Sequence, residues 1–447
     1  MENVFSKHVF YVKISKEKEN QMSIFIGPMR KHIFGNKEQT KHSELLIVDP
    51  DEVSIPLMHA NAEIQILVKP GDKVKIGDMI AKRDDRLYVP IFSSVSGTVK
   101  AIEKRQATNL KPTDYCIIEN DHQDERIDGF YLKEDSSKDE IVEYMKTIGL
   151  LGQGGAGFPS YIKYSTDKCE SLIVNAVECE PYINSDDRNI TDNLEYLKQG
   201  VKFAIKASNC KKCFICLKKY KKELINKLKD LFNDIELVTV LAVPDVYPMG
   251  WERTLVYEVL KKRYEKLPIE AGAIVSNVTS LIELARSAKE GLPIYKKYVT
   301  VAGDAVKDPH VVLCRVGTSF KQLIEICGGY TSDSIKLLAG GPMMGASVTK
   351  DEVAVTSISN CVLVLKYKVE KELSCLRCGT CVLHCPSGLQ PVNIVSSFKA
   401  KDFEALAKLK AIDCVECGMC SYVCPSKIEV TEGVRRAKRA IMQRSSK

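Results

Sequence analysis

Residues 375–386 read CLRCGTCVLHCP, and residues 414–425 read CVECGMCSYVCP. Both stretches follow the spacing C-x2-C-x2-C-x3-C-P. Three thiolates at this spacing wrap around one iron–sulfur cube, and in two-cluster ferredoxins the fourth cysteine ligates the other cube. The pattern therefore predicts two 4Fe-4S clusters. One would be held by Cys375, Cys378, Cys381 and Cys424, and the other by Cys414, Cys417, Cys420 and Cys385.

Zinc binding by four cysteines is the alternative for these two motifs. Zinc sites usually pair two C-x2-C knuckles and do not add a third cysteine and a fourth before proline. Two full copies of the longer motif therefore favour iron–sulfur clusters. His384 lies inside the first motif and is expected to tune a cluster rather than to ligate it.

The segment between the motifs, at 393–411, has apolar residues at helical spacing. Lys401-Asp402 interrupts this spacing, so two short helices are predicted. The motifs are therefore expected on a helical ferredoxin-like module, in which electrons enter at one cluster and leave at the other.

Composition describes an ordinary globular protein of several domains. The chain has 447 residues, of which 45% are hydrophobic and 28% charged, and its formal net charge is +7. This length predicts two to four domains. The lysine-rich stretch at 217–228 is interpreted as a solvated helix face rather than a nucleic-acid site. A mildly basic surface also suits an anionic membrane or an acidic redox partner.

No stretch reaches the length of a transmembrane helix, and residues 1–20 lack the pattern of a secretory signal. We therefore expect a cytoplasmic protein whose membrane association is peripheral. Its cysteines are not expected to form disulfides there. Cys210, Cys213 and Cys216 repeat a C-x2-C-x2-C spacing without a fourth Cys-Pro, and packing within a strand is preferred over a third cluster.

A glycine-rich stretch at 148–164 reads IGLLGQGGAGFPSYIKY and follows a helical pattern at 138–148. Such a loop lets backbone N–H groups contact a phosphate and lets a flat ring lie close to the chain. The layout is not strand–GxGxxG–helix, so a Rossmann unit is not predicted. A tight packing turn is the alternative. The glycines concerned are Gly152, Gly154, Gly155 and Gly157.

An acidic motif follows at 172–188, which reads LIVNAVECEPYINSDDR. The apolar strand at its start leads into Glu178 and Glu180, and strand alternation would place both carboxylates on one face. Carboxylates at the end of a buried strand suit hydrogen bonds to ribose or nicotinamide. A surface salt-bridge pair is the alternative.

The GQGGAGFP loop with Lys163 downstream, followed by NAVECEP at 175–181, resembles the flavin- and NADH-binding subunit of respiratory complex I. The chain resembles the RnfC family, which belongs to Rnf electron transport complexes, more closely and over nearly its whole length. Further matching segments, in chain order, are HIFGNKEQT (32–40), VKPGDKVKIGDMIA (68–81), SSVSGTVKAIE (93–103), VYPMGWER (246–253), VSNVTS (275–280), VTVAGDAV (299–306) and GGPMMG (340–345).

This resemblance implies FMN in a central domain, NADH as electron donor and the two clusters as acceptors. By position, the glycines of the loop would contact the flavin, with Lys163 nearby. The implied FMN and NADH pocket is completed by Asn175, Glu178, Glu180, Glu252 and Asn277. Beyond these cofactors the resemblance implies no catalytic residue.

Three positions depart from the family pattern. Gln153 stands where the complex I relative has Arg, so one phosphate-directed charge is absent. His-Ile-Phe-Gly at 32–35 replaces His-Pro-Pro. Trp251 occupies a position where glycine is usual, and it would narrow the nicotinamide side of the pocket.

The resemblance implies a multi-domain α/β fold with four parts. They are an N-terminal barrel-sandwich hybrid (1–130), a central α/β flavin- and NADH-binding domain (131–290), a β-grasp, SLBB-like module (291–360) and a C-terminal helical ferredoxin domain with two clusters (361–447).

The expected function is electron input to an Rnf-type ion-translocating complex. NADH would reduce FMN, and electrons would pass through the clusters toward membrane subunits, iron–sulfur subunits and, indirectly, ferredoxin. The implied location is the cytoplasmic face of the cell membrane, held there by partner subunits. One alternative is a soluble RnfC-like protein that feeds a dedicated reductase for cobalamin or amino acids. Another is an iron–sulfur relay that has lost the flavin.

Overall fold

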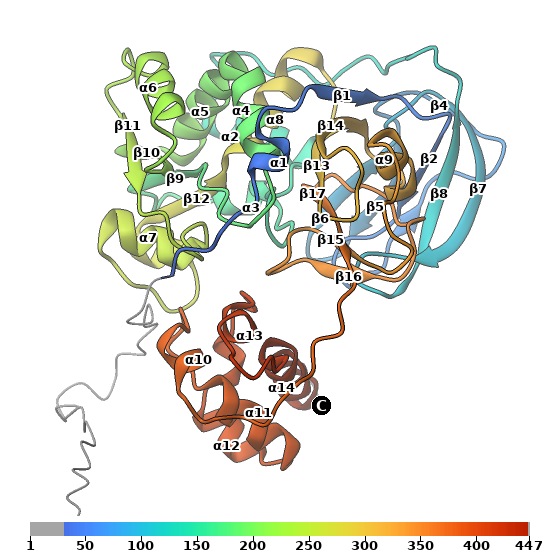
Figure 1. The fold of residues 1–447 in the computed structure, drawn as a ribbon. Coiled ribbons are helices and arrows are strands. Elements are labelled where there is room, and N and C mark those ends of the chain that lie inside the picture. The colour runs from blue at the N-terminus through green and yellow to red at the C-terminus, as the bar shows by residue number, and fades with distance from the viewer. Residues whose placement is uncertain (1–30, 446–447) are drawn as a thin grey trace, which may run out of the picture.

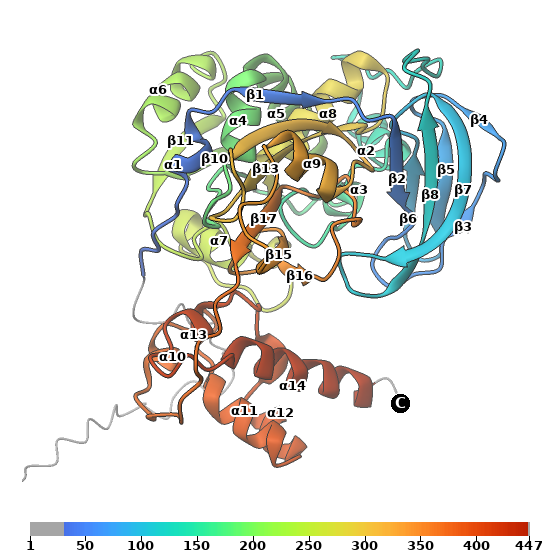
Figure 2. The same ribbon diagram turned by 45° about the vertical axis from the view of Figure 1, so that its right-hand side comes forward.

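The computed structural model describes residues 31–445, so the stretch at 1–20 that was judged for a secretory signal lies outside the described residues. A body of sheets and helices carries a smaller helical domain, and the chain that follows the last strand joins the two (Figures 1 and 2). This arrangement agrees with the expected multi-domain α/β class. Among the described helices, none has both the length and the apolar character needed to cross a bilayer.

The N-terminal part is a sandwich of two antiparallel sheets. Val53, Ile80, Val99 and Ile118 come from both sheets and form its buried core. The larger sheet has the order β2 (Glu52–Pro56), β8 (Pro112–Asn120), β7 (Gly97–Gln106), β4 (Lys73–Val74), and the smaller one β3 (Gln65–Ile66), β5 (Met79–Asp84), β6 (Tyr88–Phe92).

The central domain is built on a parallel sheet with strand order β11-β10-β9-β12. Both faces of its strands are buried, as expected for a parallel sheet between helices. Its strands are β9 (Ser171–Asn175), β10 (Lys212–Lys218), β11 (Val238–Val243) and β12 (Ala273–Asn277). Its helices are α2 (Lys138–Thr147), α3 (Ser160–Tyr164), α4 (Ser185–Asp192), α5 (Leu194–Ser208), α6 (Lys222–Leu231), α7 (Glu252–Leu260), the 3-10 helix η1 (Pro268–Ala271) and α8 (Val278–Glu290).

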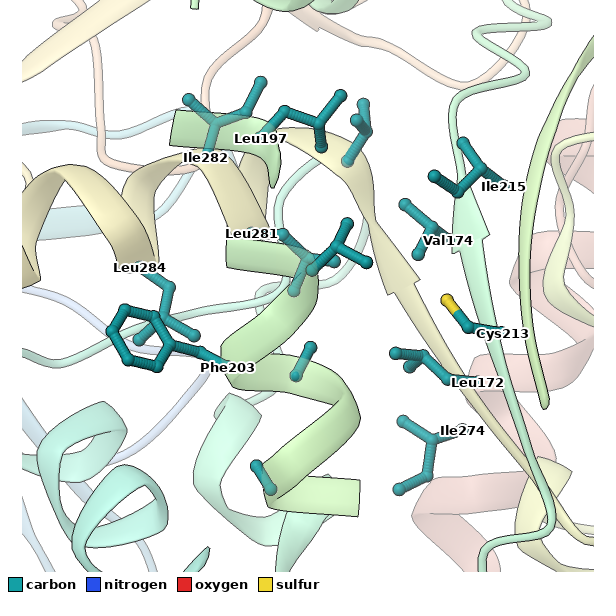
Figure 3. Packing of buried hydrophobic residues seen from close by; sticks show 14 of the residues in the cluster. Leu172, Val174, Leu197, Phe203, Cys213, Ile215, Ile274, Leu281, Ile282 and Leu284 are labelled. Atoms are coloured by element: carbon teal, nitrogen blue, oxygen red, sulfur yellow. The ribbon is translucent and has the colours of Figure 1, made fainter. Parts of the chain in front are cut away.

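Alternate residues of these strands serve two separate cores. Leu172 and Cys213 point toward α5 and α8 (Figure 3), whereas Cys216 packs on the opposite face beside α7. Cys210 is also buried with the first group. The prediction that this cysteine triplet packs in and beside a strand is therefore confirmed.

A six-stranded mixed sheet follows, with α9 (Phe320–Ile326) packed on it through Phe320 and Leu323. Two of its strands fall outside the predicted range 291–360. β1 lies in the predicted first domain, and β17 begins just after the predicted boundary; hydrogen-bond partners so far apart leave no mark in the local pattern. The order is β1 (Leu45–Val48), β14 (His310–Arg315), β13 (Lys296–Ala302), β17 (Cys361–Lys366), β15 (Ile335–Ala339), β16 (Ala346–Val348), and α1 (Glu38–Lys41) precedes β1.

Short helices form the C-terminal domain around a core that includes Ile394, Leu406 and Val434. The predicted interruption at Lys401-Asp402 is confirmed: Lys401 has φ +56°, and the Asp402 side chain caps the next helix by accepting from the Ala405 N–H. The elements are α10 (Thr380–Leu383), α11 (Pro391–Lys399), α12 (Phe403–Lys408), the 3-10 helix η2 (Ala411–Asp413), α13 (Met419–Tyr422) and α14 (Val430–Ser445).

The close approach of α5 to α8 generates the first prediction. A Cβ added at Gly200 would overlap the carbonyl of Leu281. Gly200→Ala should therefore push the two helices apart and lower the free energy of unfolding by about 1–3 kcal/mol, the usual cost of overpacking. Chemical denaturation measures this change. Lys202→Ala, at an exposed site on the same helix, is the control, and equal stability of the two variants would contradict the packing described.

Candidate functional site

The carboxyl ends of the four parallel strands meet at one edge of the central sheet. In open α/β sheets, ligands bind at this edge. β9 ends at Asn175, β10 at Lys218 and β12 at Asn277, and the acidic motif follows β9 directly. The glycine loop reaches the same edge, because a Cβ at Gly154 would lie 3.0 Å from the Asn277 side chain.

The glycine loop is held from behind and open in front. The Gly152 N–H donates to the Phe158 carbonyl at 2.9 Å, and the Gln153 N–H donates to the Ser280 hydroxyl at 2.9 Å. Gly154 has φ +68°, which favours glycine. A Cβ at Gly155 would meet nothing within 4 Å, so a flat ring has room against this part of the backbone.

Lys163 approaches the loop from α3. A Cβ at Gly152 would lie 3.9 Å from its ammonium, which donates to the Val275 carbonyl at 3.1 Å. Burial lowers the pKa of Lys163, and Glu252 opposes that shift. Glu252 opens α7 directly after Trp251, the residue at the N-cap. Lys163 and Glu252 thus supply one cation and one carboxylate on the same side of the loop.

The two asparagines of the predicted site hold the strand ends in place. Asn175 donates to the Gly250 carbonyl at 2.9 Å, which ties β9 to the segment before α7. Asn277 caps α8 and also donates to Asp186 at 2.9 Å. The Asn277 amide lies beside Gly154 and is thus the one of the two that borders the glycine loop.

Glu178 lies in a buried cluster of charges. Its carboxylate accepts from the Asp186 N–H at 2.7 Å and faces the ammonium groups of Lys37 and Lys221 at 3.6 and 4.0 Å. Burial raises the pKa of Glu178 to about 8, against the attraction of Lys37. Within the described chain, its second oxygen has no hydrogen-bond partner, and neither has the buried hydroxyl of Ser185. Unpartnered buried polar atoms at this edge fit a polar ligand.

Glu180 points elsewhere. It accepts from the N–H groups of Met343 and Met344 at 2.7 and 2.9 Å, in the GGPMMG turn of the β-grasp sheet. Burial raises the pKa of Glu180, and these two N–H groups oppose the shift. The expectation that Glu178 and Glu180 share one face is therefore wrong. β9 ends at Asn175 and Glu178 has φ +40°, so the chain is no longer extended where the carboxylates occur.

Several functional candidates were missed in the sequence. Lys218 and Lys221 fall in the stretch interpreted as a solvated face, yet both are buried at the strand ends. Lys218 pairs with Asp245 at 2.8 Å and Lys221 with Asp187 at 2.5 Å. The solvated-face prediction is wrong for these two lysines, because β10 extends to Lys218 and α6 begins only at Lys222. A lysine directly after a buried strand was the available signal.

A buried cation also stands behind Gln153, the residue that replaces the arginine of the complex I relative. Lys297 of β13 is 3% exposed, and its ammonium donates to the Gln153 side-chain oxygen at 2.6 Å. Burial lowers the pKa of Lys297, while Glu283 and Asp186 favour its charged form. The charge that Gln153 lacks is therefore partly replaced from the β-grasp sheet.

The cysteines of the second motif gather with the last cysteine of the first. Burial raises the pKa of Cys417, and the neighbouring thiols of Cys420, Cys385 and Cys414 raise it further. This proximity agrees with the predicted exchange of the fourth ligand between the motifs. Cys375 and Cys378 are exposed. In the described part of the chain, no three His, Cys, Asp or Glu side chains are arranged to hold a single metal ion.

The second motif is also the one that contacts the body. The Tyr247 hydroxyl donates to the Cys417 carbonyl at 2.7 Å. Cys417 and Met419 are buried with Tyr247 and Ile33, and Met343 packs against them. The replacement of His-Pro-Pro in the N-terminal segment thus places Ile33 in this contact. His384 keeps a local partner, with its Nδ1 lying 2.9 Å from the Thr380 carbonyl.

Comparison with protein families divides the chain in the same order. The RnfC barrel sandwich hybrid domain matches residues 30–123, the Nuo51 FMN-binding domain 145–286, the SLBB domain 298–347 and the 4Fe-4S dicluster domain 374–428. The expected fold class is confirmed. FMN and two 4Fe-4S clusters are accordingly the cofactors of this chain, and the open glycine loop and the grouped cysteines fit them.

One similar structure is an NAD+-reducing [NiFe]-hydrogenase, at 18% identity and a TM-score of 0.49, over 70% of this chain and 62% of that one. Curated relatives are more similar in sequence. The RnfC-type protein of the proton-translocating ferredoxin:NAD+ oxidoreductase complex of Clostridium ljungdahlii is 33% identical, over 84% of this chain and 85% of that protein. Its counterpart in the Na+-translocating complex of Acetobacterium woodii is 33% identical, over 89% and 93%.

The corresponding protein of the ion-translocating oxidoreductase complex of Vibrio cholerae is 32% identical over 85% of this chain, and the match spans 51% of that longer protein. The matched families run from the barrel sandwich to the dicluster domain in the order that the sequence motifs predicted. The chain belongs to the RnfC family of oxidoreductase subunits, which work with the other subunits of an ion-translocating ferredoxin:NAD+ oxidoreductase complex.

Proposed function

We propose that this chain is the electron-input subunit of an Rnf-type complex. NADH is oxidised at the edge of the central sheet, and electrons leave through the helical domain toward the membrane subunits and ferredoxin. The chain lies on the cytoplasmic face of the membrane, held there by partner subunits. The contact between Tyr247 and Cys417 carries this proposal, because it joins the flavin side of the body directly to a cluster-binding loop.

FMN, when bound, exchanges a hydride with the nicotinamide and single electrons with the clusters. The chain's own task is to bind and orient. The backbone of the glycine loop offers N–H groups to the phosphate, and Lys163 adds a cation beside Gly152. Glu178 and Glu252 border the space left for the nicotinamide nucleotide. Trp251 begins the turn into α7 and narrows that space.

The two cysteine motifs have different places in the route. The second motif packs against Tyr247 and Met343, so its ligands form the input side of the helical domain. The first motif carries the exposed Cys375 and Cys378 and forms the exit side. An input side that faces the flavin domain and an exit side that faces outward match a chain that hands electrons to another protein.

An anaerobic titration tests the proposal. The protein with both clusters and FMN is mixed with NADH while the flavin and iron–sulfur absorbance bands are recorded. Both bands should bleach at a rate that saturates with NADH. If dithionite bleaches the clusters and NADH does not, the chain does not oxidise NADH, and another reductant must supply its electrons.

Removal of one ligand from each motif tests the order of the clusters. Cys378→Ser should leave rapid bleaching of the remaining cluster by NADH, because the input side is intact. Cys417→Ser should leave a cluster that dithionite reduces and that NADH reduces far more slowly. Stopped-flow absorbance and iron content measure both. The reverse result would place the first motif on the input side.

The buried charge behind Gln153 gives a prediction on flavin affinity. Lys297→Met should weaken FMN binding about tenfold, the usual scale for losing a charge-assisted contact. Lys297→Arg should retain most of the affinity because it keeps the charge. Quenching of FMN fluorescence by the flavin-free protein measures this without any turnover.

Lys296→Met is the matched control for this prediction. Lys296 is the neighbouring residue of β13 and is only half-buried, so its loss should leave FMN affinity unchanged. Thermal melting of each variant confirms that the sheet is intact. Wild-type affinity in a folded Lys297→Met variant would show that Lys297 acts only in packing.

A further inference from the structure

The excess positive charge of the chain is confined to one part of it. Residues 366–447 contain fifteen Lys and Arg against eight Asp and Glu, a net charge of +7 that equals the net charge of the whole chain. The rest of the chain carries equal numbers of cationic and acidic side chains. Long-range attraction of an acidic partner is therefore directed at the helical domain.

The exit side of this domain also exposes apolar side chains. We define the exit face as Leu373, Leu376, Val382 and Leu383 with Lys371 and Arg377. The exposed fractions of the four apolar residues are 54%, 68%, 37% and 43%. They lie within eleven residues of the chain, around the exposed Cys375 and Cys378. Contiguous exposed apolar residues with a charged rim are typical of protein interfaces.

We propose that the exit face is the docking surface for an acidic iron–sulfur protein, which takes electrons from the cluster of the first motif. The inference rests on the exit role proposed above for that motif. An anionic membrane would meet the same charge, but lipid accepts no electrons. The apolar residues instead surround the cysteines from which electrons must leave. Apolar contact brings the partner close to Cys375 and Cys378, and the basic rim steers it.

Binding of a small acidic two-cluster ferredoxin, used as the probe, tests the surface. The full chain with its clusters is titrated anaerobically by calorimetry at about 0.05 M and about 0.5 M salt, a range over which screening becomes strong. Binding should be detected at low salt and should weaken at least about tenfold at high salt. No binding at low salt, or binding indifferent to salt, would overturn the proposal.

Two exit-face variants are compared with one matched control. Lys371→Glu/Arg377→Glu and Leu376→Ser should each weaken ferredoxin binding by about tenfold. Lys399→Glu/Lys401→Glu makes the same change of charge on exposed residues at the end of α11 and should weaken it less than about twofold, by the same reasoning. Because Arg377 adjoins a ligand, Lys368→Glu/Lys371→Glu is measured as well, and iron content confirms that the clusters remain.

Three further outcomes would contradict the inference. Equal weakening by the control would mean that ferredoxin senses only the overall charge. If the exit-face variants lose binding to phosphatidylglycerol vesicles and keep ferredoxin binding, the exit face belongs to the membrane. If they instead lose self-association in sedimentation, it belongs to a second copy of the chain. None of these measurements uses NADH, so they remain decisive even if NADH is not the reductant.

Discussion

Tyr247 joins three of the four parts of this protein and its N-terminal segment. Its N–H donates to the carbonyl of Lys31 in that segment, and its hydroxyl donates to the carbonyl of Cys417 in the helical domain. Met343 of the β-grasp sheet packs into the same buried group. Single-electron transfer requires redox centres to be held close together. The hydroxyl of one tyrosine of the flavin-binding domain thus fixes the loop that carries three cluster ligands.

The same region gathers an unusual number of buried charges. Lys37, Lys221 and Lys218 face Glu178, Asp187 and Asp245 at the carboxyl edge of the sheet. Buried ion pairs add little to stability, because the loss of hydration offsets their attraction. Their position at a ligand-binding edge argues for a role in binding, since strongly perturbed groups concentrate at functional sites. Glu178, with one unpartnered oxygen among the described residues, is the member of this cluster best placed to meet a ligand.

Electrostatics also divides the molecule along the electron route. The body is close to balanced in charge and binds small anionic cofactors through a few buried lysines. The helical domain carries the excess positive charge on its surface, where it acts at long range on a protein partner. Charge that binds a cofactor must be desolvated and accurately placed, whereas charge that steers a partner needs only to be exposed and of one sign.

The sequence by itself determined the parts whose chemistry is local. Two C-x2-C-x2-C-x3-C-P motifs, a glycine-rich loop and the helix break at Lys401 each occupy a short stretch, so spacing alone predicts them. Only the tertiary structure decided how these parts face each other. It turned Glu178 and Glu180 apart, buried Lys218 and Lys221, and set Lys297 behind Gln153. It also turned the second cysteine motif, and not the first, toward the body. These features depend on contacts between residues far apart in the chain, and a linear pattern carries no information on which distant strand or turn will supply the partner.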